Sequence, residues 1–139
     1  MTKPFCALIL LVGTYAFGQN PATMKQLMLD LIHPAANDLL LVVSRGGPQN
    51  EAEWATARRS ALTLAESGDG LAKPRRGIVD PNWEADVKLL ADAGAAAYQA
   101  AKAKDAKALA ATAGRIDASC TTCHKQFRPD VFPRQGGSQ

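Results

Sequence analysis

The sequence predicts an all-α fold, a bundle of four helices, and three observations support this prediction. Segments with apolar residues at helical spacing follow one another along the chain, separated by clusters of glycine, proline and aspartate. No stretch shows the alternation of apolar and polar residues that a half-buried strand requires. Alanine recurs on the apolar faces, where its small side chain allows helices to approach closely.

The first two predicted helices are separated by a glycine-rich turn. We expect the first over residues 22–44, bent where Pro34 removes a backbone hydrogen bond. Residues 45–48, Arg-Gly-Gly-Pro, end it. The second is expected over residues 51–67 and stops at the Gly-Asp-Gly sequence of residues 68–70. The apolar residues at helical spacing are Met24, Leu27, Met28, Leu31 and Ile32 in the first helix and Trp54, Ala57, Ala61, Leu64 and Ala65 in the second.

The last two predicted helices each begin at an aspartate. A long loop, residues 71–79, leads to Asp80, which can cap the third helix with Pro81 at its first position. Asp105 is expected to cap the fourth helix, which continues to about Arg128. The apolar faces contain Trp83, Val87, Leu90, Ala97, Tyr98 and Ala101 in the third helix and Leu109, Ala113, Ile116, Cys120, Cys123 and Phe127 in the fourth.

The N-terminus has the features of a cleavable secretory signal. Lys3 supplies a positive charge, and residues 5–12 form an apolar run too short to span a bilayer as a helix. Ala16 and Gly18 have the small side chains that a cleavage site requires. We therefore expect residues 1–18 to be removed on export, and an uncleaved membrane anchor is the alternative.

The mature chain, residues 19–139, is long enough for one domain and too short for two. Loss of Lys3 reduces the 16 basic residues to 15 against 13 acidic ones, so the net charge of +2 favours no nucleic-acid partner. The one basic cluster, residues 73–76, is interpreted as a solvated loop. Cys6 leaves with the signal, so we expect no structural disulfide and no membrane-spanning segment in the mature protein.

The two remaining cysteines belong to the sequence Cys-Thr-Thr-Cys-His of residues 120–124. Cys-x-x-Cys-His is the attachment site of a c-type haem. The thiols of Cys120 and Cys123 add to the two vinyl groups of the porphyrin as thioethers, and the two-residue spacer matches the separation of those groups. His124 then lies under the iron as its proximal ligand. The sequence thus predicts one covalently attached haem c, whose attachment outside the cytoplasm agrees with export.

Three other kinds of site contain Cys-x-x-Cys. A redox-active pair is expected near a βαβ unit, and no such pattern is present. A zinc site needs about four ligands, and outside the motif the mature chain offers only His33 as a further histidine or cysteine. A structural disulfide is the third alternative. We interpret the motif as a haem site because a histidine directly follows the second cysteine.

A haem motif near the C-terminus, on the last helix of a four-helix bundle, resembles the class II cytochromes c, the cytochrome c′ and cytochrome c556 group. Class I cytochromes c instead have this motif near the N-terminus. The likeness covers the mature chain in helix number and order. It is specific only over residues 120–128, where Cys-x-x-Cys-His-x-x-Phe-Arg is similar to the ending of the group. It implies an up-down-up-down antiparallel bundle with covalent haem on the C-terminal helix.

The resemblance also implies that a residue of the first helix faces the distal side of the haem. A methionine there gives a six-coordinate electron carrier, and an apolar residue leaves the iron five-coordinate. Met28 matches this position better than Met24, one turn earlier, although methionine on an apolar face is more often a core residue. His33 is rotated by about 140° from Met28 on an ideal helix, and we expect it to be partly exposed. We favour Met28, with Met24, His33 or no sixth ligand as alternatives.

Other candidate residues lie beside the motif or on the apolar faces. Phe127 is expected to pack on the haem. The resemblance implies that Arg128 pairs with a haem propionate or shapes proximal access, and an exposed cation at a helix end is the alternative. Core or haem-pocket packing is expected of the aromatic residues at helical spacing, which are Trp54, Trp83 and Tyr98.

Two functions are compatible with these features. The first is a periplasmic protein, not an enzyme, that carries single electrons between redox partner proteins through a His/Met-ligated haem. A module that serves one specific membrane or periplasmic enzyme is a variant of it. The second is a five-coordinate, cytochrome c′-like protein that binds NO or CO. The resemblance further implies that two copies can pair through their first two helices.

Overall fold

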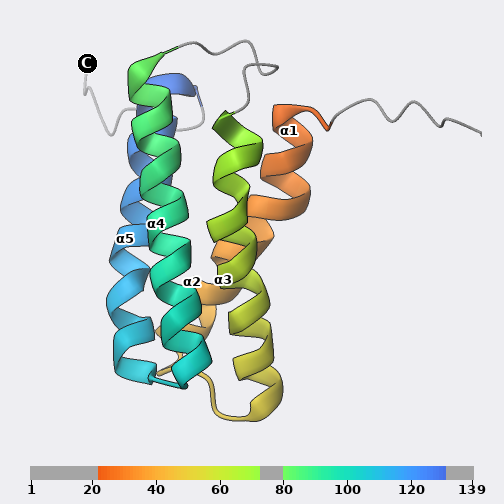
Figure 1. The fold of residues 1–139 in the computed structure, drawn as a ribbon, viewed down its shortest axis with the longest axis vertical. Helices are drawn as coiled ribbons and strands as arrows, with labels where there is room; N and C mark the ends of the chain where they lie inside the picture. The colour runs from red at the N-terminus through yellow and green to blue at the C-terminus, as the bar shows by residue number, and fades with distance from the viewer. Residues whose placement is uncertain (1–21, 73–79, 131–139) are drawn as a thin grey trace, which may run out of the picture.

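The protein is a bundle of four helices that pack against one another (Figure 1). The computed structural model describes residues 22–72 and 80–130, and these ranges contain no strand. The first helix has three consecutive parts, α1 (Met24–Leu27), η1 (Met28–Ile32) and α2 (His33–Ser44), and is followed by α3 (Glu51–Ala72), α4 (Pro81–Ala103) and α5 (Ala106–Phe127). The predicted all-α fold is confirmed. The predicted signal, residues 1–18, and the basic cluster, residues 73–76, lie outside the described residues.

Successive helices run in opposite directions (Figure 1). The start of α1, the end of α3, the start of α4 and the end of α5 therefore lie at the same end of the bundle. α4 packs most extensively against α3 and then against α5, while the first helix packs against α3 and α5. This arrangement places the Cys-x-x-Cys-His motif at the same end of the bundle as the first turns of the first helix.

The first helix contains a π-helical turn just before its proline. Pro34 has no N–H, and in an α-helix its ring would crowd the carbonyl group of Asp30. The helix widens at this point, where the N–H of His33 donates to the carbonyl oxygen of Met28, the spacing of a π turn. The predicted disturbance at Pro34 is therefore a local π turn that begins at Met28.

Side-chain caps begin the helices where the sequence predicted them. The Asp80 carboxylate accepts a hydrogen bond from the Asn82 N–H at 2.7 Å at the start of α4. The Asp105 carboxylate accepts a hydrogen bond from the Ala108 N–H at 2.8 Å at the start of α5. These caps satisfy N–H groups that have no partner inside the helix. Both predicted helix starts are confirmed.

The predicted end of the second helix was wrong. α3 continues through the Gly-Asp-Gly sequence of residues 68–70 to Ala72. A Cβ atom at Gly68 would lie 2.9 Å from the Cβ atom of Ala91, so the missing side chain lets α4 approach. Leu71 is 2% exposed, and its carbonyl oxygen accepts a hydrogen bond from Trp83 Nε1 at 3.1 Å. Packing against α4 thus outweighs the low helix propensity of glycine.

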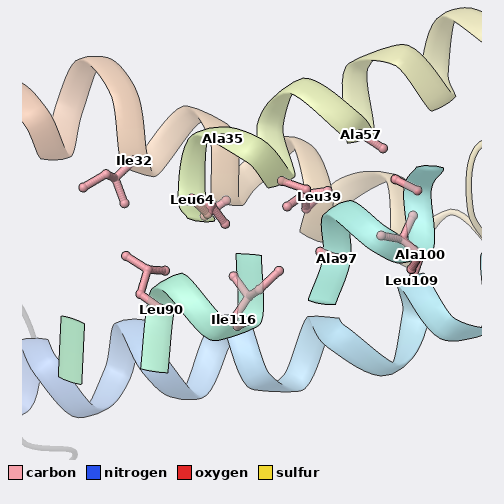
Figure 2. Packing of buried hydrophobic residues seen from close by; sticks show 14 of the residues in the cluster. Ile32, Ala35, Leu39, Ala57, Leu64, Leu90, Ala97, Ala100, Leu109 and Ile116 are labelled. Carbon is pink, nitrogen blue, oxygen red and sulfur yellow. The ribbon is translucent and has the colours of Figure 1, made fainter. Parts of the chain in front are cut away.

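The core extends along the axis of the bundle and contains many alanines. Figure 2 shows Ile32 of the first helix, Leu64 of α3, Leu90 of α4 and Ile116 of α5, which belong to one buried cluster. Several alanines are completely buried where helices meet, namely Ala61, Ala93, Ala97 and Ala101. Such small side chains keep the helices close together and give the bundle a narrow, well-packed interior.

The first helix is unusually apolar. By length and composition alone, Met24–Ser44 could cross a membrane, with a mean hydropathy of 1.4. In the bundle it buries one stripe of side chains, which are Ile32, Ala35, Ala36, Leu39 and Val42. Three leucines of the same helix are exposed, namely Leu29, Leu31 and Leu41. Its apolar character therefore has two sources, a core-facing stripe and an exposed set of leucines.

α3 and α4 approach closely at Gly94. A Cβ atom at this position would lie 2.8 Å from the carbonyl carbon of Leu64 and would also collide with the backbone nitrogen of Ala65. Backbone atoms cannot give way without displacing α3. At Gly114 on α5, by contrast, an added Cβ would meet no atom within 4 Å.

We expect Gly94→Ala to lower the free energy of unfolding by about 1–3 kcal/mol, because the added methyl group overpacks the α3–α4 contact. The matched substitution Gly114→Ala should raise it by about 0.5–1 kcal/mol, because alanine is the better helix former. Urea unfolding followed by circular dichroism measures both changes. Equal effects at the two positions would contradict the close approach at Gly94.

Candidate cofactor site

The two cysteines and the histidine of the motif lie in the last turns of α5. Residues spaced by three or four share a helix face, so Cys120 and Cys123 continue the buried face of Ile116, which is 0% exposed. Both thiols are free and partly buried, and Cys123 packs against the hydrophobic core. His124 is also partly buried. Of the predicted apolar face of the last helix, Leu109 and Ile116 are buried, and Ala113, Cys120, Cys123 and Phe127 are partly buried.

A small cavity brings the motif together with residues of the other helices. Its volume is about 30 Å³. It is lined by Met28 of the first helix, Leu71 of α3, Asp86, Val87 and Leu90 of α4, and Ser119, Cys120, Cys123 and His124 of α5. The three motif residues and the favoured distal ligand therefore border one cavity, although the first helix and α5 are far apart in the sequence.

Of the three candidates for a sixth iron ligand, only Met28 lines this cavity. Met24 is partly buried and packs against the core one turn nearer the start of the helix. His33 is exposed. The π turn changes the angle expected between Met28 and His33 on an ideal α-helix, but it does not bury the imidazole. The positions of the side chains therefore favour Met28.

The surroundings of the two thiols keep them protonated. Burial raises the pKa of the Cys120 thiol above its ordinary value. At Cys123, burial is the main cause and the negative charge of Asp86 the next, and the pKa rises to about 11. A thiol reacts as a nucleophile through its thiolate form, so neither cysteine resembles the low-pKa cysteine of a redox enzyme.

His124 is held in an environment that favours the neutral imidazole. Burial and then the positive charge of Arg128 lower the pKa of His124. The neutral form is the one that binds a metal ion. Arg128 directly follows α5, and its backbone N–H donates to the carbonyl oxygen of His124 at 2.8 Å. Its exposed guanidinium group donates to both carboxylate oxygens of Asp130, at 3.1 and 3.0 Å. The structure thus places Arg128 beside His124, and the propionate contact stays a prediction.

An aromatic contact joins α4 to the end of α5. The rings of Trp83 and Phe127 meet edge to face, with centroids 5.1 Å apart and planes at 87°. Because Trp83 also donates its indole N–H to the carbonyl oxygen of Leu71, one side chain connects three helices. Trp54 is buried and Tyr98 partly buried against the core. The predicted packing of the aromatic residues is confirmed, and contact between Phe127 and haem stays a prediction.

Asp86 is a cavity residue that the sequence interpretation missed. It is 6% exposed, and its Oδ2 atom has no hydrogen-bond partner among the described residues. Burial, followed by the charge of Asp80, raises the pKa of Asp86. The spacing could have revealed it, because Asp86 lies three residues after Trp83 and four before Leu90 on the buried face of α4. Two buried polar residues of α5 were also missed, and their hydroxyl groups donate to carbonyl oxygens at 2.7 Å, namely Thr112 and Ser119.

An all-α bundle with a Cys-x-x-Cys-His motif on its last helix is similar to the haem-binding cytochromes of the all-α type. The family model described as Cytochrome C′ matches residues 79–128, which comprise α4, α5 and the Cys-x-x-Cys-His motif. The match supports a class II cytochrome c, of the cytochrome c′ and c556 type. Proteins of this family bind covalently attached haem c with its iron, and they transfer electrons or bind gases. No curated protein and no solved structure matches the chain significantly.

The residues around the cavity fit a haem c group. Two thiols on one helix face and an imidazole beside them are the groups that attach such a haem and bind its iron, and a thioether on a facing helix can add a sixth ligand. The unpaired Oδ2 atom of Asp86 offers a negative charge to a cationic centre. Residues 22–72 and 80–130 contain no group of three or more His, Cys, Asp and Glu side chains placed to hold a metal ion alone. The cavity is much smaller than a porphyrin, so haem would displace side chains that fill the site here.

We expect the Cys123 thiol to be alkylated slowly in the folded protein without haem. A pKa of about 11 against an ordinary value of 9.0 leaves about a hundredfold less thiolate at any pH below both values. The rate should therefore rise about tenfold per pH unit through pH 10. Iodoacetamide labelling of residues 19–139 carrying Cys120→Ser measures this profile. The urea-unfolded chain is the control. An alkylation rate of the folded protein that levels off at the same pH as that of the unfolded chain would contradict the burial of Cys123.

Proposed function

We propose that this protein is an exported cytochrome that carries single electrons through one haem c. In this proposal Cys120 and Cys123 form the thioether links, His124 is the proximal iron ligand and Met28 is the distal ligand. The observation that carries the proposal is that all four side chains border the same cavity. The family match supports the coarser function, electron transfer or gas binding by a haem protein.

The side chains around the cavity suit outer-sphere electron transfer. When bound, haem c supplies an iron that accepts and releases one electron. The Met28 thioether is an uncharged, polarisable ligand that favours the ferrous state and so raises the reduction potential. Leu71, Val87 and Leu90 exclude water from that side of the site. The edge-to-face contact of Trp83 with Phe127 holds the end of α5 against α4.

Export to the periplasm completes the proposal. Thioether attachment of haem takes place outside the cytoplasm, and members of the cytochrome c′ family are typically periplasmic. The N-terminal residues 1–18 are proposed to direct export and then to be cleaved. The partners are redox proteins that supply and remove the electron. Pairing of two copies through the first two helices also stays a prediction, and the exposed leucines of these helices are Leu29, Leu31, Leu41 and Leu62.

The second candidate is a five-coordinate protein that binds NO or CO. The description of the matching family as Cytochrome C′ favours it, because that group includes proteins with an open distal site. The two candidates differ at one atom, the Met28 sulfur. If this sulfur does not bind the iron, the distal side is available to a diatomic gas.

Absorption spectra of the haem-loaded protein distinguish the two functions. We expect a low-spin ferric spectrum with a weak methionine-to-iron band, because Met28 completes the coordination of the iron. Met28→Ala should remove this band and produce a high-spin spectrum. Met24→Ala is the matched control, one turn away on the same helix, and should keep the band.

A high-spin ferric spectrum that neither substitution changes would contradict the electron-transfer proposal. Rapid binding of carbon monoxide by the reduced protein would then support the gas-binding function. Covalent haem itself is tested separately. Replacing Cys120 and Cys123 by serine should abolish haem retention after denaturation.

A further inference from the structure

The carboxyl group of Asp86 is buried at the edge of the candidate haem site. Asp86 is 6% exposed and lines the cavity together with Met28, Cys123 and His124. Its negative charge acts on Cys123, whose thiol pKa it helps to raise. It therefore lies close to one of the two predicted attachment points of the porphyrin. Apolar side chains border the same cavity on α3 and α4, so little solvent screens this charge.

Burying a carboxylate without a hydrogen-bond or ion-pair partner lowers the stability of the fold. The Oδ2 atom of Asp86 accepts no hydrogen bond, and no cationic side chain forms an ion pair with Asp86 in residues 22–72 and 80–130. Among the residues that the structure describes, the charged neighbour that acts on it is Asp80, which has the same sign. A buried carboxyl group without a partner favours its protonated form, and a nearby positive charge favours the carboxylate. Within residues 22–72 and 80–130, no side chain compensates this carboxylate with a positive charge, and a bound cationic group can supply one.

We propose that Asp86 sets the reduction potential of the haem by stabilising the oxidised iron. This inference rests on the proposed attachment of haem to Cys120 and Cys123, and it does not depend on the identity of the sixth ligand. The oxidised centre carries one more positive charge than the reduced centre. The electron that reduces it comes from a redox partner, and no bond is formed or broken. A fixed negative charge beside this centre favours the oxidised state and lowers the potential.

Asp86 and Met28 therefore act in opposite directions. The thioether favours the reduced state, while the carboxylate favours the oxidised state. The two groups come from different helices, α4 and η1, and border the same cavity. Asp86 thus changes the reduction potential through its charge and exchanges no electron itself.

Spectroelectrochemical titration of the haem-loaded protein tests the proposal. We expect Asp86→Asn to shift the equilibrium about tenfold toward the reduced iron, which corresponds to about 59 mV for a one-electron couple. Asp86→Ala should shift it in the same direction and serves as a second neutral variant. Asp86→Glu, which keeps the charge, should stay close to the original potential.

Glu84→Gln is the matched control, because it removes the same charge from an exposed position on α4. Solvent and salt screen an exposed charge, so this control should shift the equilibrium by about twofold or less. An unchanged potential in both Asp86→Asn and Asp86→Ala, or equal shifts in Asp86→Asn and Glu84→Gln, would overturn the proposal. Loss of haem when the original protein is denatured would instead contradict covalent attachment. Both the proposed function and this inference would then be wrong.

Discussion

The register of α5 is the constraint on which the rest of the site depends. Leu109 and Ile116 are almost completely buried, so they decide which face of this helix points into the bundle. Cys120 and Cys123 follow at helical spacing and must continue that face. A shift of one residue would turn the helix by about 100° and carry both thiols away from the cavity. The order of the four helices then places this end of α5 opposite the first turns of the first helix (Figure 1).

The other walls of the site add groups with different chemistry. The first helix contributes Met28, which stands at the start of the π turn that accommodates Pro34. Such turns are frequent at functional sites, where they change the direction of a side chain without ending the helix. α4 contributes the Asp86 carboxylate. A thioether, a carboxylate and a thiol–imidazole motif thus meet from three helices. In the proposed function each acts on the iron or its porphyrin in a different way.

Local signals predicted most of the fold and part of the site. Asp80 and Asp105 could be recognised as caps because capping depends on neighbouring residues alone, and the motif of residues 120–124 carries its own chemistry in its spacing. The end of α3 could not be predicted, because it depends on packing against a later helix, where Ala91 lies close to Gly68 and Trp83 binds the carbonyl oxygen of Leu71. Asp86 was missed because aspartate side chains are usually exposed, and its burial depends on the packing of all four helices around the cavity. Tertiary contacts decide both of these features.

The most direct test of the proposed site is proton NMR spectroscopy of the reduced, haem-loaded protein. The ring current of the porphyrin moves the methyl resonance of an iron-bound methionine far upfield. We expect one such resonance in the original protein, its loss in Met28→Leu and its retention in Met24→Leu. The absence of any upfield methionine methyl resonance, or its loss only when Met24 is replaced, would contradict the placement of Met28 opposite His124.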